Sequence, residues 1–336
     1  MPPAQLKTVL TKAWGPNWLR QFQKFDVHPI AAASIGQVHR AQLKDGRDVA
    51  IKVQYPGVAQ SIDSDVTNVA TLVKLSGLVP KGLNIDAYIE EARKQLHEET
   101  DYLREAEHLN NFQRLLNGLD RYEIPEVQDD LTVSSILTMS FIESKPLEDV
   151  ADLKLTQRSQ ITSDLIHLVL LELFEFGIIQ SDPNFANFRY NPQTSKLVLL
   201  DFGATRTISS QITDAYRNFL LAGIDDEMAL AQNAAQSLGL WDDTTDPRHI
   251  AQLTDMMGTV FEAVRTMDIY DFADPTLTRH LNAEGIKLAK SGFVPPTVPT
   301  DVLFIQRKLA GVFLIAANLK ARVNLKEILL SQLRPI

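Results

Sequence analysis

The hydrophobic pattern of this chain changes near residue 145, and that change limits its fold more than any other feature. Before residue 145, β-rich runs at 30–43, 48–55 and 134–142 alternate with helical stretches at 61–78 and 85–116. After it the chain is mostly helical, with candidate helices at 157–176, 211–238, 249–266, 276–290 and 303–319. A strand-containing first part followed by a helical second part predicts an α+β protein with two lobes.

Turn signals refine this division. Asp45-Gly46 lies in a polar four-residue stretch between the runs 30–43 and 48–55, and this pattern predicts a β-hairpin. We therefore expect an N-terminal helical segment at 1–28, a strand-bearing lobe with inserted helices at 29–143, and a helical lobe at 144–336.

Composition removes several classes of function. The 336 residues carry a formal net charge of −9, which argues against a nucleic-acid-binding surface. The chain has no cysteine, so disulfides, cysteine-ligated zinc, iron–sulfur clusters and thiol catalysis are excluded. Its seven histidines include no close pair at metal-ligand spacing. No apolar run reaches the length of a membrane span, although association with a membrane surface stays open.

Four short motifs follow one another in a fixed order. A loop with little glycine at 31–38 precedes a β-like run that ends in Lys52. Asn187 is the fifth residue after Asp182, and nineteen residues after Asp182 an apolar run leads into the Asp-Phe-Gly motif that begins at Asp201. Each motif alone is a common strand or turn. Their order and spacing, however, match the phosphate loop, strand lysine, catalytic loop and metal loop of protein kinases.

These residue types suit the chemistry of a nucleoside triphosphate with Mg²⁺. Lys52 supplies a positive charge for the α- and β-phosphates and needs a carboxylate to aim it. Asp201 and Asn187 offer the hard oxygen ligands that Mg²⁺ prefers. Asp182 lies where a general base would accept a proton from a hydroxyl group or from water. We therefore expect phosphoryl transfer from ATP, with these four residues at the site.

The expected phosphate loop departs from that of ordinary kinases. When Gly36 and Val38 are aligned with the last glycine and the valine of the kinase loop, Ala31 and Ala33 occupy the first two glycine positions. Alanine disfavours positive φ angles and adds a methyl group where a backbone would approach a phosphate. We expect a stiffer loop with altered nucleotide affinity. The alternative is that 31–33 simply begins a strand or a helix.

Longer segments resemble the UbiB family of atypical kinases, from about Leu6 to the C-terminal end. Residues 29–39 (PIAAASIGQVH) are similar to the alanine-rich loop of that family, as are 49–58 (VAIKVQYPGV) to its lysine strand. Residues 101–106 (DYLREA) are similar to its charged helix motif, and 180–184 (QSDPN) to its catalytic loop. Within the family, the chain most resembles the mitochondrial coenzyme Q biosynthesis branch.

The resemblance implies a protein-kinase-like fold with extra helices, binding of Mg²⁺ with ATP or ADP, and a slow ATPase activity. It implies a role in coenzyme Q (ubiquinone) biosynthesis at the matrix face of the inner mitochondrial membrane. The implied partners are coenzyme Q biosynthesis proteins, an anionic lipid surface and isoprenoid quinone precursors. The residues that it assigns to nucleotide binding are Ala31, Ala32, Ala33, Ser34, Ile35, Gly36, Val38, Ala50, Lys52, Met139, Ser140, Phe141 and Ile142.

The family pattern also assigns Glu99 as the carboxylate that pairs with Lys52, and Asp101 completes its Glu-x-Asp motif. The lysine strand and the helical stretch at 85–116 stand in the order that such a pairing needs. Other carboxylates on this stretch could simply face solvent, namely Glu91, Glu98 and Glu105.

Two features of relatives or of ordinary kinases are missing. We find no Lys-x-Gly-Gln motif, so we expect the chain to begin after the N-terminal extension of the family. The N-terminus also lacks a signal-peptide core and a convincing transit peptide, so either the protein stays where it is made or a leader has been removed. No Ala-Pro-Glu segment follows Asp201, which argues against an ordinary groove for protein substrates.

Trp14 and Trp18, four residues apart, would share one apolar helical face. Such a face either packs on the body of the protein or docks on a membrane or on the missing extension.

Three functions therefore stay open. The first is a Mg²⁺-dependent ATPase that supports coenzyme Q biosynthesis. The second is a lipid or small-molecule kinase, in which a precursor hydroxyl group replaces water. The third is a nucleotide-gated scaffold whose output is a change of conformation and for which catalysis is not essential. An ordinary protein kinase fits least, because of the altered phosphate loop and the missing substrate segment.

Overall fold

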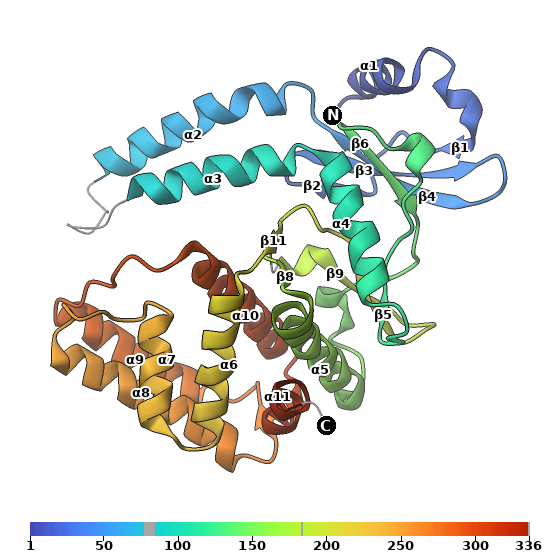
Figure 1. Ribbon diagram of the computed structural model, residues 1–336. Coiled ribbons are helices and arrows are strands. Elements are labelled where there is room, and N and C mark those ends of the chain that lie inside the picture. The colour runs from blue at the N-terminus through green and yellow to red at the C-terminus, as the bar shows by residue number, and fades with distance from the viewer. Residues whose placement is uncertain (77–84, 183, 335–336) are drawn as a thin grey trace. The chain divides into compact units, whose positions relative to one another are not determined.

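The computed structural model of the chain describes residues 1–76, 85–182 and 184–334 (Figure 1). The chain divides into two compact units. Unit 1 comprises Met1–Ser144 and Phe188–Thr205, and unit 2 comprises Lys145–Asn187 and Arg206–Ile336. Unit 1 carries a five-stranded sheet, whereas unit 2 is mainly helical, which confirms the predicted α+β class.

The main sheet of unit 1 is antiparallel, with strand order β1-β3-β4-β6 and with β2 paired to β3. β3 and β4 form the predicted hairpin, in which Asp45-Gly46 makes the turn and Gly46 adopts a φ of 92°. The strands are β1 (Phe22–Phe25), β2 (Ala31–Ala33), β3 (Gly36–Leu43), β4 (Asp48–Gln54) and β6 (Ile136–Ser140).

Side-chain alternation along β4 sends its residues to the two faces of the sheet. Val49, Ile51 and Val53 are fully buried in a core that also contains Leu10 of helix α1 (Pro3–Trp14). Lys52 alternates with these residues and therefore points to the opposite face. The strand register thus directs the lysine of the motif away from the apolar core.

Trp14 and Trp18 pack on unit 1 itself. The centroids of their rings lie 6.3 Å apart, and both rings approach Phe22 of β1, at 5.7 and 6.2 Å. Trp18 also makes an edge-to-face contact with Phe25, at 5.1 Å. Of the roles considered for these tryptophans, packing on the body of the protein is the one that the structure shows.

Three helices follow the hairpin in unit 1, namely α2 (Val58–Leu75), α3 (Ile85–Glu99) and α4 (Tyr102–Leu115). α2 and α3 lie side by side (Figure 1). The single helical stretch expected at 85–116 is broken at Asp101, whose side chain accepts hydrogen bonds from two amides and caps α4. The last two residues of the helix expected at 61–78 lie outside the described residues.

A small second set of strands leads to the loop that begins at Asp201, the expected metal loop. β10 (Lys196–Leu199) pairs with β9 (Phe188–Asn191) in an antiparallel hairpin and with β5 (Tyr122–Glu123) in parallel. Leu197, Val198 and Leu199 are buried, which holds β10 in place. Because β10 ends two residues before Asp201, this pairing fixes where the metal loop begins.

Unit 2 opens with β7 (Lys145–Pro146) and with α5 (Leu155–Leu171), which runs into a π-helical turn at Glu172–Phe176. The helix expected at 211–238 is two helices, because the chain turns at Asp225-Asp226, where Asp226 adopts a φ of 64°. The remaining elements are β8 (Ile178–Gln180), β11 (Thr205–Thr207), α6 (Ser210–Ile224), α7 (Met228–Ser237), α8 (Pro247–Thr266), β12 (Tyr270–Asp271), α9 (Thr276–Lys290), α10 (Thr300–Asn318), β13 (Arg322–Val323) and α11 (Leu325–Leu333). Within the described ranges, no helix combines the length and the hydrophobicity that crossing a bilayer requires.

We expect Leu10→Ala to lower the free energy of unfolding by about 3 kcal/mol, because it removes a fully buried side chain between α1 and the sheet. The control is Leu19→Ala, since Leu19 is 57% exposed. This control should change the free energy of unfolding by less than about 0.5 kcal/mol. Urea unfolding followed by tryptophan fluorescence measures both. Equal losses would contradict the placement of α1 on the core.

Candidate functional site

Lys52 of β4 lies at the centre of a buried cluster of charges in unit 1. Its Nζ donates to both carboxylate oxygens of Glu105 on α4, at 2.8 and 2.9 Å, and to Oδ2 of Asp201, at 3.1 Å. The side chains of Lys52 and Glu105 are 8% and 2% exposed, and that of Asp201 is 33% exposed. The structure thus brings together two predicted site residues, Lys52 and Asp201, with a carboxylate that had no assigned role.

The charges of this cluster depend on one another. Burial by itself would lower the pKa of Lys52, but Asp201 and Glu105 outweigh burial and hold this pKa above its usual value. Burial, together with the charge of Asp201, raises the pKa of Glu105 to about 7. Burial would also raise the pKa of Asp201, yet Lys52 and the amide of Gly203 keep it below its usual value. At neutral pH the lysine is therefore protonated and Asp201 ionised, as phosphate and metal binding require.

The prediction that Glu99 pairs with Lys52 is wrong. Glu99 ends α3, and its carboxylate accepts hydrogen bonds from Ser34 at 3.4 Å and from Gln95 at 3.5 Å. The physical reason is the break after α3, because α4 starts as a new, separately capped helix and carries the carboxylate that reaches the lysine. Glu105, one of the neighbours that could have faced solvent, takes this position.

The helix α4 also holds the metal loop through side chains that the sequence did not single out. Arg104 donates from Nη1 to the carbonyl oxygen of Gly203 at 3.1 Å, and from Nη2 to that of Thr205 at 3.0 Å. Phe112 packs on Phe202, with ring centroids 4.6 Å apart. The 101–106 motif contains Arg104 and is the sequence signal that could have found it.

The alanine-rich loop is a hairpin. Ala31–Ala33 form the strand β2, as one alternative predicted, and Ala33 lies opposite Gly36 of β3. Gly36 is required by packing, because a Cβ atom there would lie 2.4 Å from the carbonyl oxygen of Val53 and 3.0 Å from Oη of Tyr102. The other predicted residues of this hairpin are Ala32, Ser34, Ile35 and Val38.

The predicted nucleotide-binding residues 139–142 lie at the end of β6 and directly after it, and the family resemblance implies that the backbone of 140–142 bonds adenine. Met139 lies opposite Ala50 of β4, so these two predicted residues are neighbours. The amides of Ser140 and Phe141 both donate to backbone carbonyl groups of unit 1, at 2.8 and 2.9 Å. An adenine ring would therefore have to bond other backbone groups of this segment, such as those of Ile142.

In unit 2 the catalytic-loop residues Asp182 and Asn187 are joined. Nδ2 of Asn187 donates to Oδ2 of Asp182 at 3.0 Å and to its backbone carbonyl oxygen at 3.1 Å. Oδ1 of Asp182 accepts a hydrogen bond from Nη2 of Arg307 on α10, at 2.9 Å. Arg307 lies 125 residues away in the sequence, and no local pattern pointed to it. Pro183 lies outside the described residues.

Each of the two loops, taken by itself, offers an oxygen donor of the type that binds Mg²⁺. Asp201 offers a carboxylate, and the amide of Asn187 uses its nitrogen on Asp182, so that its oxygen is the atom suited to a metal. Among the described residues, no cluster of three or more histidine, aspartate or glutamate side chains could hold a metal by itself. Mg²⁺ is commonly held by one or two protein oxygens together with substrate phosphates, and the oxygen that each loop offers is of the type that such binding uses.

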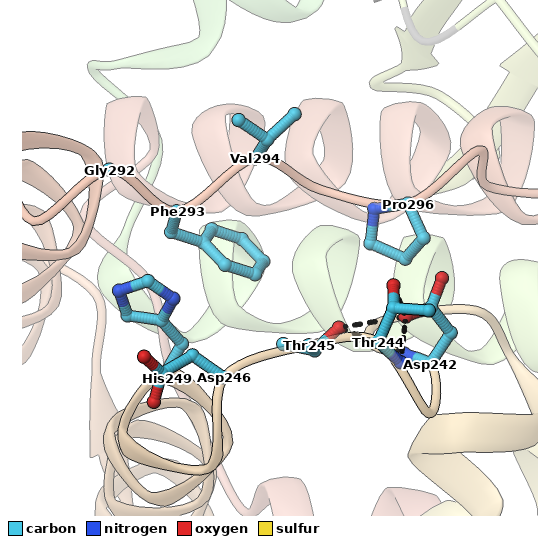
Figure 2. A pocket seen from close by; sticks show the side chains of 9 residues that line it. All are labelled: Asp242, Thr244, Thr245, Asp246, His249, Gly292, Phe293, Val294 and Pro296. Carbon is cyan, nitrogen blue, oxygen red and sulfur yellow. Dashed lines mark hydrogen bonds between the residues drawn. The ribbon is translucent and has the colours of Figure 1, made fainter. Parts of the chain in front are cut away.

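A hollow of about 300 Å³ in unit 2 is lined by residues of the segments 242–249 and 292–296 (Figure 2). Asp242 accepts hydrogen bonds there from the hydroxyl groups of Thr244 and Thr245, at 2.7 and 3.1 Å. The ring of His249 stands edge-on to that of Phe293, with centroids 5.5 Å apart. Because none of the predicted site residues lines this hollow, it is not the candidate site.

Comparison with known proteins identifies the family. The ABC1 atypical kinase-like domain matches residues 1–235. The "Atypical kinase coq-8, mitochondrial" of Caenorhabditis elegans is 36% identical over 96% of this chain and 43% of the worm protein. The "Atypical kinase COQ8, mitochondrial" of Saccharomyces cerevisiae is 36% identical over 96% of this chain and 65% of the yeast protein. The chain thus spans between 43% and 65% of the length of these two relatives.

A solved structure has the same fold. The Rv3197 protein of Mycobacterium tuberculosis, determined as a complex with erythromycin, aligns with a TM-score of 0.77 over 100% of this chain and 83% of that chain. Its sequence identity is 23%, so this likeness concerns the fold alone. The fold is of the protein-kinase-like α+β class, and the matches confirm the resemblance to the UbiB family. This chain therefore belongs to the family of ABC1 atypical kinase-like proteins.

Proposed function

We propose that this protein is an atypical kinase-like ATPase, which binds ATP with Mg²⁺ and transfers the terminal phosphoryl group to water or to a small molecule. The observation that carries this proposal is the position of Nζ of Lys52, within 3.1 Å of carboxylates from both α4 and the metal loop. A lysine paired in this way is charged and fixed in direction. The pairing of a strand lysine with a helix carboxylate is a requirement of active kinase sites.

Each of the five candidate site residues has a proposed role. Lys52 would hold the α- and β-phosphates, and Glu105 would aim the lysine at them. Asp201 and Asn187 would hold Mg²⁺, which neutralises charge on the phosphates when it is bound. Asp182 would orient the nucleophile or accept its proton.

The proposed nucleotide-binding groups are the hairpin 31–38, Ala50 and the segment 139–142. Within this hairpin all three residues of β2 pair with β3, and Ser34 in the turn also bonds to Glu99. A loop held in this way has less freedom to close over phosphates than a glycine-rich loop. This rigidity supports an altered affinity for nucleotides.

The names of the relatives support a place in coenzyme Q biosynthesis. The worm and yeast proteins are named coq-8 and COQ8, and both are called mitochondrial. We propose that this chain supports the same pathway at the matrix face of the inner mitochondrial membrane. Its proposed partners are coenzyme Q biosynthesis proteins, an anionic lipid surface and isoprenoid quinone precursors.

We expect Asp201→Asn to abolish phosphate release from Mg·ATP, because an amide is a weaker ligand for Mg²⁺ than a carboxylate and carries no charge for Lys52. The matched control is Asp120→Asn, which changes a fully exposed carboxylate of unit 1 and should keep the wild-type rate. Phosphate release is measured with and without anionic liposomes that carry a phenolic quinone precursor.

Turnover that needs Asp201 and rises with these liposomes would support a membrane-coupled ATPase. Phosphate recovered on the precursor would identify a small-molecule kinase instead. Unchanged turnover in Asp201→Asn would contradict the role given to this residue.

Glu105→Gln should lower kcat/KM for ATP hydrolysis by about 100-fold, because Lys52 loses the partner that aims it. Glu99→Gln is the comparison variant and should lower kcat/KM by much less, because the amide oxygen of glutamine can still accept the hydrogen bonds from Ser34 and Gln95. Steady-state kinetics measure both variants. The reverse order of effects would restore Glu99 as the pairing residue.

The same pairing predicts a pH dependence. Because burial raises the pKa of Glu105 to about 7, lowering the pH through that value protonates the carboxylate and breaks its pairing with Lys52. We expect kcat/KM of the wild type to fall as the pH decreases through about 7, since this parameter reports groups of the free enzyme. In Glu105→Gln this decrease of kcat/KM at low pH should be absent. The same decrease in both proteins would show that a group other than Glu105 causes it.

A further inference from the structure

One face of α10 contacts both the catalytic loop and the segment that follows the metal loop. Asp301 accepts a hydrogen bond from the amide of Ser209 at 3.2 Å, and the guanidinium carbon of Arg206 lies 4.0 Å from the ring centre of Phe304. The next side chains of this row, at 307–308, reach the catalytic loop. Helical residues spaced by three or four positions lie on one face. α10 therefore presents a row of anchoring side chains to both segments.

Arg307 and Asn187 hold the carboxylate of Asp182 from two sides. Nη2 of Arg307 donates to Oδ1 at 2.9 Å, and Nδ2 of Asn187 donates to Oδ2 at 3.0 Å. Hydrogen bonds between ionised groups are short and directional. With one donor on each oxygen, the plane of the carboxylate is fixed.

Lys308 anchors the backbone two residues before Asp182. Its side chain is 1% exposed, and Nζ donates to the carbonyl oxygen of Gln180 at 2.8 Å and to Oε1 of Gln180 at 3.2 Å. It also forms an ion pair with Glu172, which is equally buried, at 3.2 Å. Glu172 begins the π-helical turn at the end of α5, and such turns are frequent at functional sites.

A buried ion pair adds little to the free energy of unfolding, because well-packed apolar residues of similar volume often stabilise a protein equally or more. Here the Lys308 ammonium contacts the buried carboxylate of Glu172 and donates to two oxygens of Gln180, two residues before Asp182. Such an arrangement specifies a position for the catalytic loop. The contacts come from α10, which lies beyond the residues 1–235 that the family domain matches.

We propose that Arg307 and Lys308 are positioning residues, through which α10 fixes the catalytic loop and orients the carboxylate of Asp182 toward the nucleophile. This inference rests on the proposed function, because it takes Asp182 as the group that orients the nucleophile or receives its proton. Arg307 acts on the carboxylate, and Lys308 acts on the backbone that carries it. A shift of about 1 Å at such a group can lower a rate by about 100-fold, so the loss of either contact should appear in kcat.

The first test measures kcat and KM for ATP hydrolysis in Arg307→Gln, in Arg307→Lys and in the control Gln306→Ala, which removes an exposed neighbour on α10. Arg307→Gln should lower kcat by about 10- to 100-fold and leave KM within about threefold, because the contact orients the base and does not bind nucleotide. Arg307→Lys keeps the charge and should recover part of the loss. A wild-type kcat in Arg307→Gln, or an equal loss in the control, would overturn the role of Arg307.

The second test does not depend on turnover. Amide hydrogen exchange at 180–182 and 184–187 is compared among the wild type, Arg307→Gln and the double variant Glu172→Leu/Lys308→Met. The double variant removes both buried charges. A single substitution would leave one buried charge without its partner, and that would destabilise the protein strongly. Faster exchange of these amides, by about tenfold, with unchanged protection in α5 and α10, is the expected result.

Unchanged exchange at these amides would overturn the anchoring role of α10. A wild-type protein that hydrolyses no ATP would instead overturn the proposed function. The exchange result would then still decide whether α10 anchors the loop, so the two failures can be told apart.

Discussion

Unit 1 depends on the neutralisation of one buried lysine. An ammonium group inside a protein costs several kcal/mol unless carboxylates compensate for it, and Lys52 has two such partners, Glu105 and Asp201. The three residues come from strand β4, from helix α4 and from the loop after β10. The sheet, the helix and the metal loop must therefore form together, because each supplies one charge that the others need.

The expected metal loop and the expected catalytic loop are each held by one helix, and each of these helices offers two consecutive charged residues. On α4, Arg104 donates to backbone carbonyl groups of the expected metal loop. Glu105 pairs with Lys52, which also bonds Asp201 at the start of that loop. On α10, Arg307 bonds the carboxylate of Asp182, and Lys308 bonds the backbone before it. Successive helical residues point about 100° apart, so two neighbours can reach two different points of one loop. Each helix thus fixes both a functional side chain and the backbone around it.

The inserted helices of unit 1 also reach the alanine-rich hairpin. Glu99, at the end of α3, accepts a hydrogen bond from Ser34 in that hairpin. The glutamate that the family pattern assigned to the lysine therefore lies beside the expected phosphate loop. The Glu-x-Asp motif still has a structural meaning, because its second residue, Asp101, caps α4 and so places Glu105. The motif lies at the break between α3 and α4. Glu99 at the end of α3 bonds Ser34, whereas Glu105 on α4 bonds Lys52.

The sequence by itself determined the local features of this protein. The turn at Asp45-Gly46, the strand that carries Lys52 and the loop that carries Asp182 and Asn187 depend on residues close together in the chain, and their patterns predicted them. The change of hydrophobic pattern near residue 145 was enough to predict the α+β class, and the longer segments around the motifs were enough to predict the family.

Only the tertiary structure decided which groups complete the site. Periodicity alone could not choose Glu105 over Glu99, because the choice depends on the cap at Asp101, which ends one helix and sets the direction of the next. Arg307 could not be predicted at all, since it meets Asp182 across 125 residues of sequence. Such contacts arise from the packing of whole helices, and a short-range sequence pattern carries no information about which distant helix face will cover a loop.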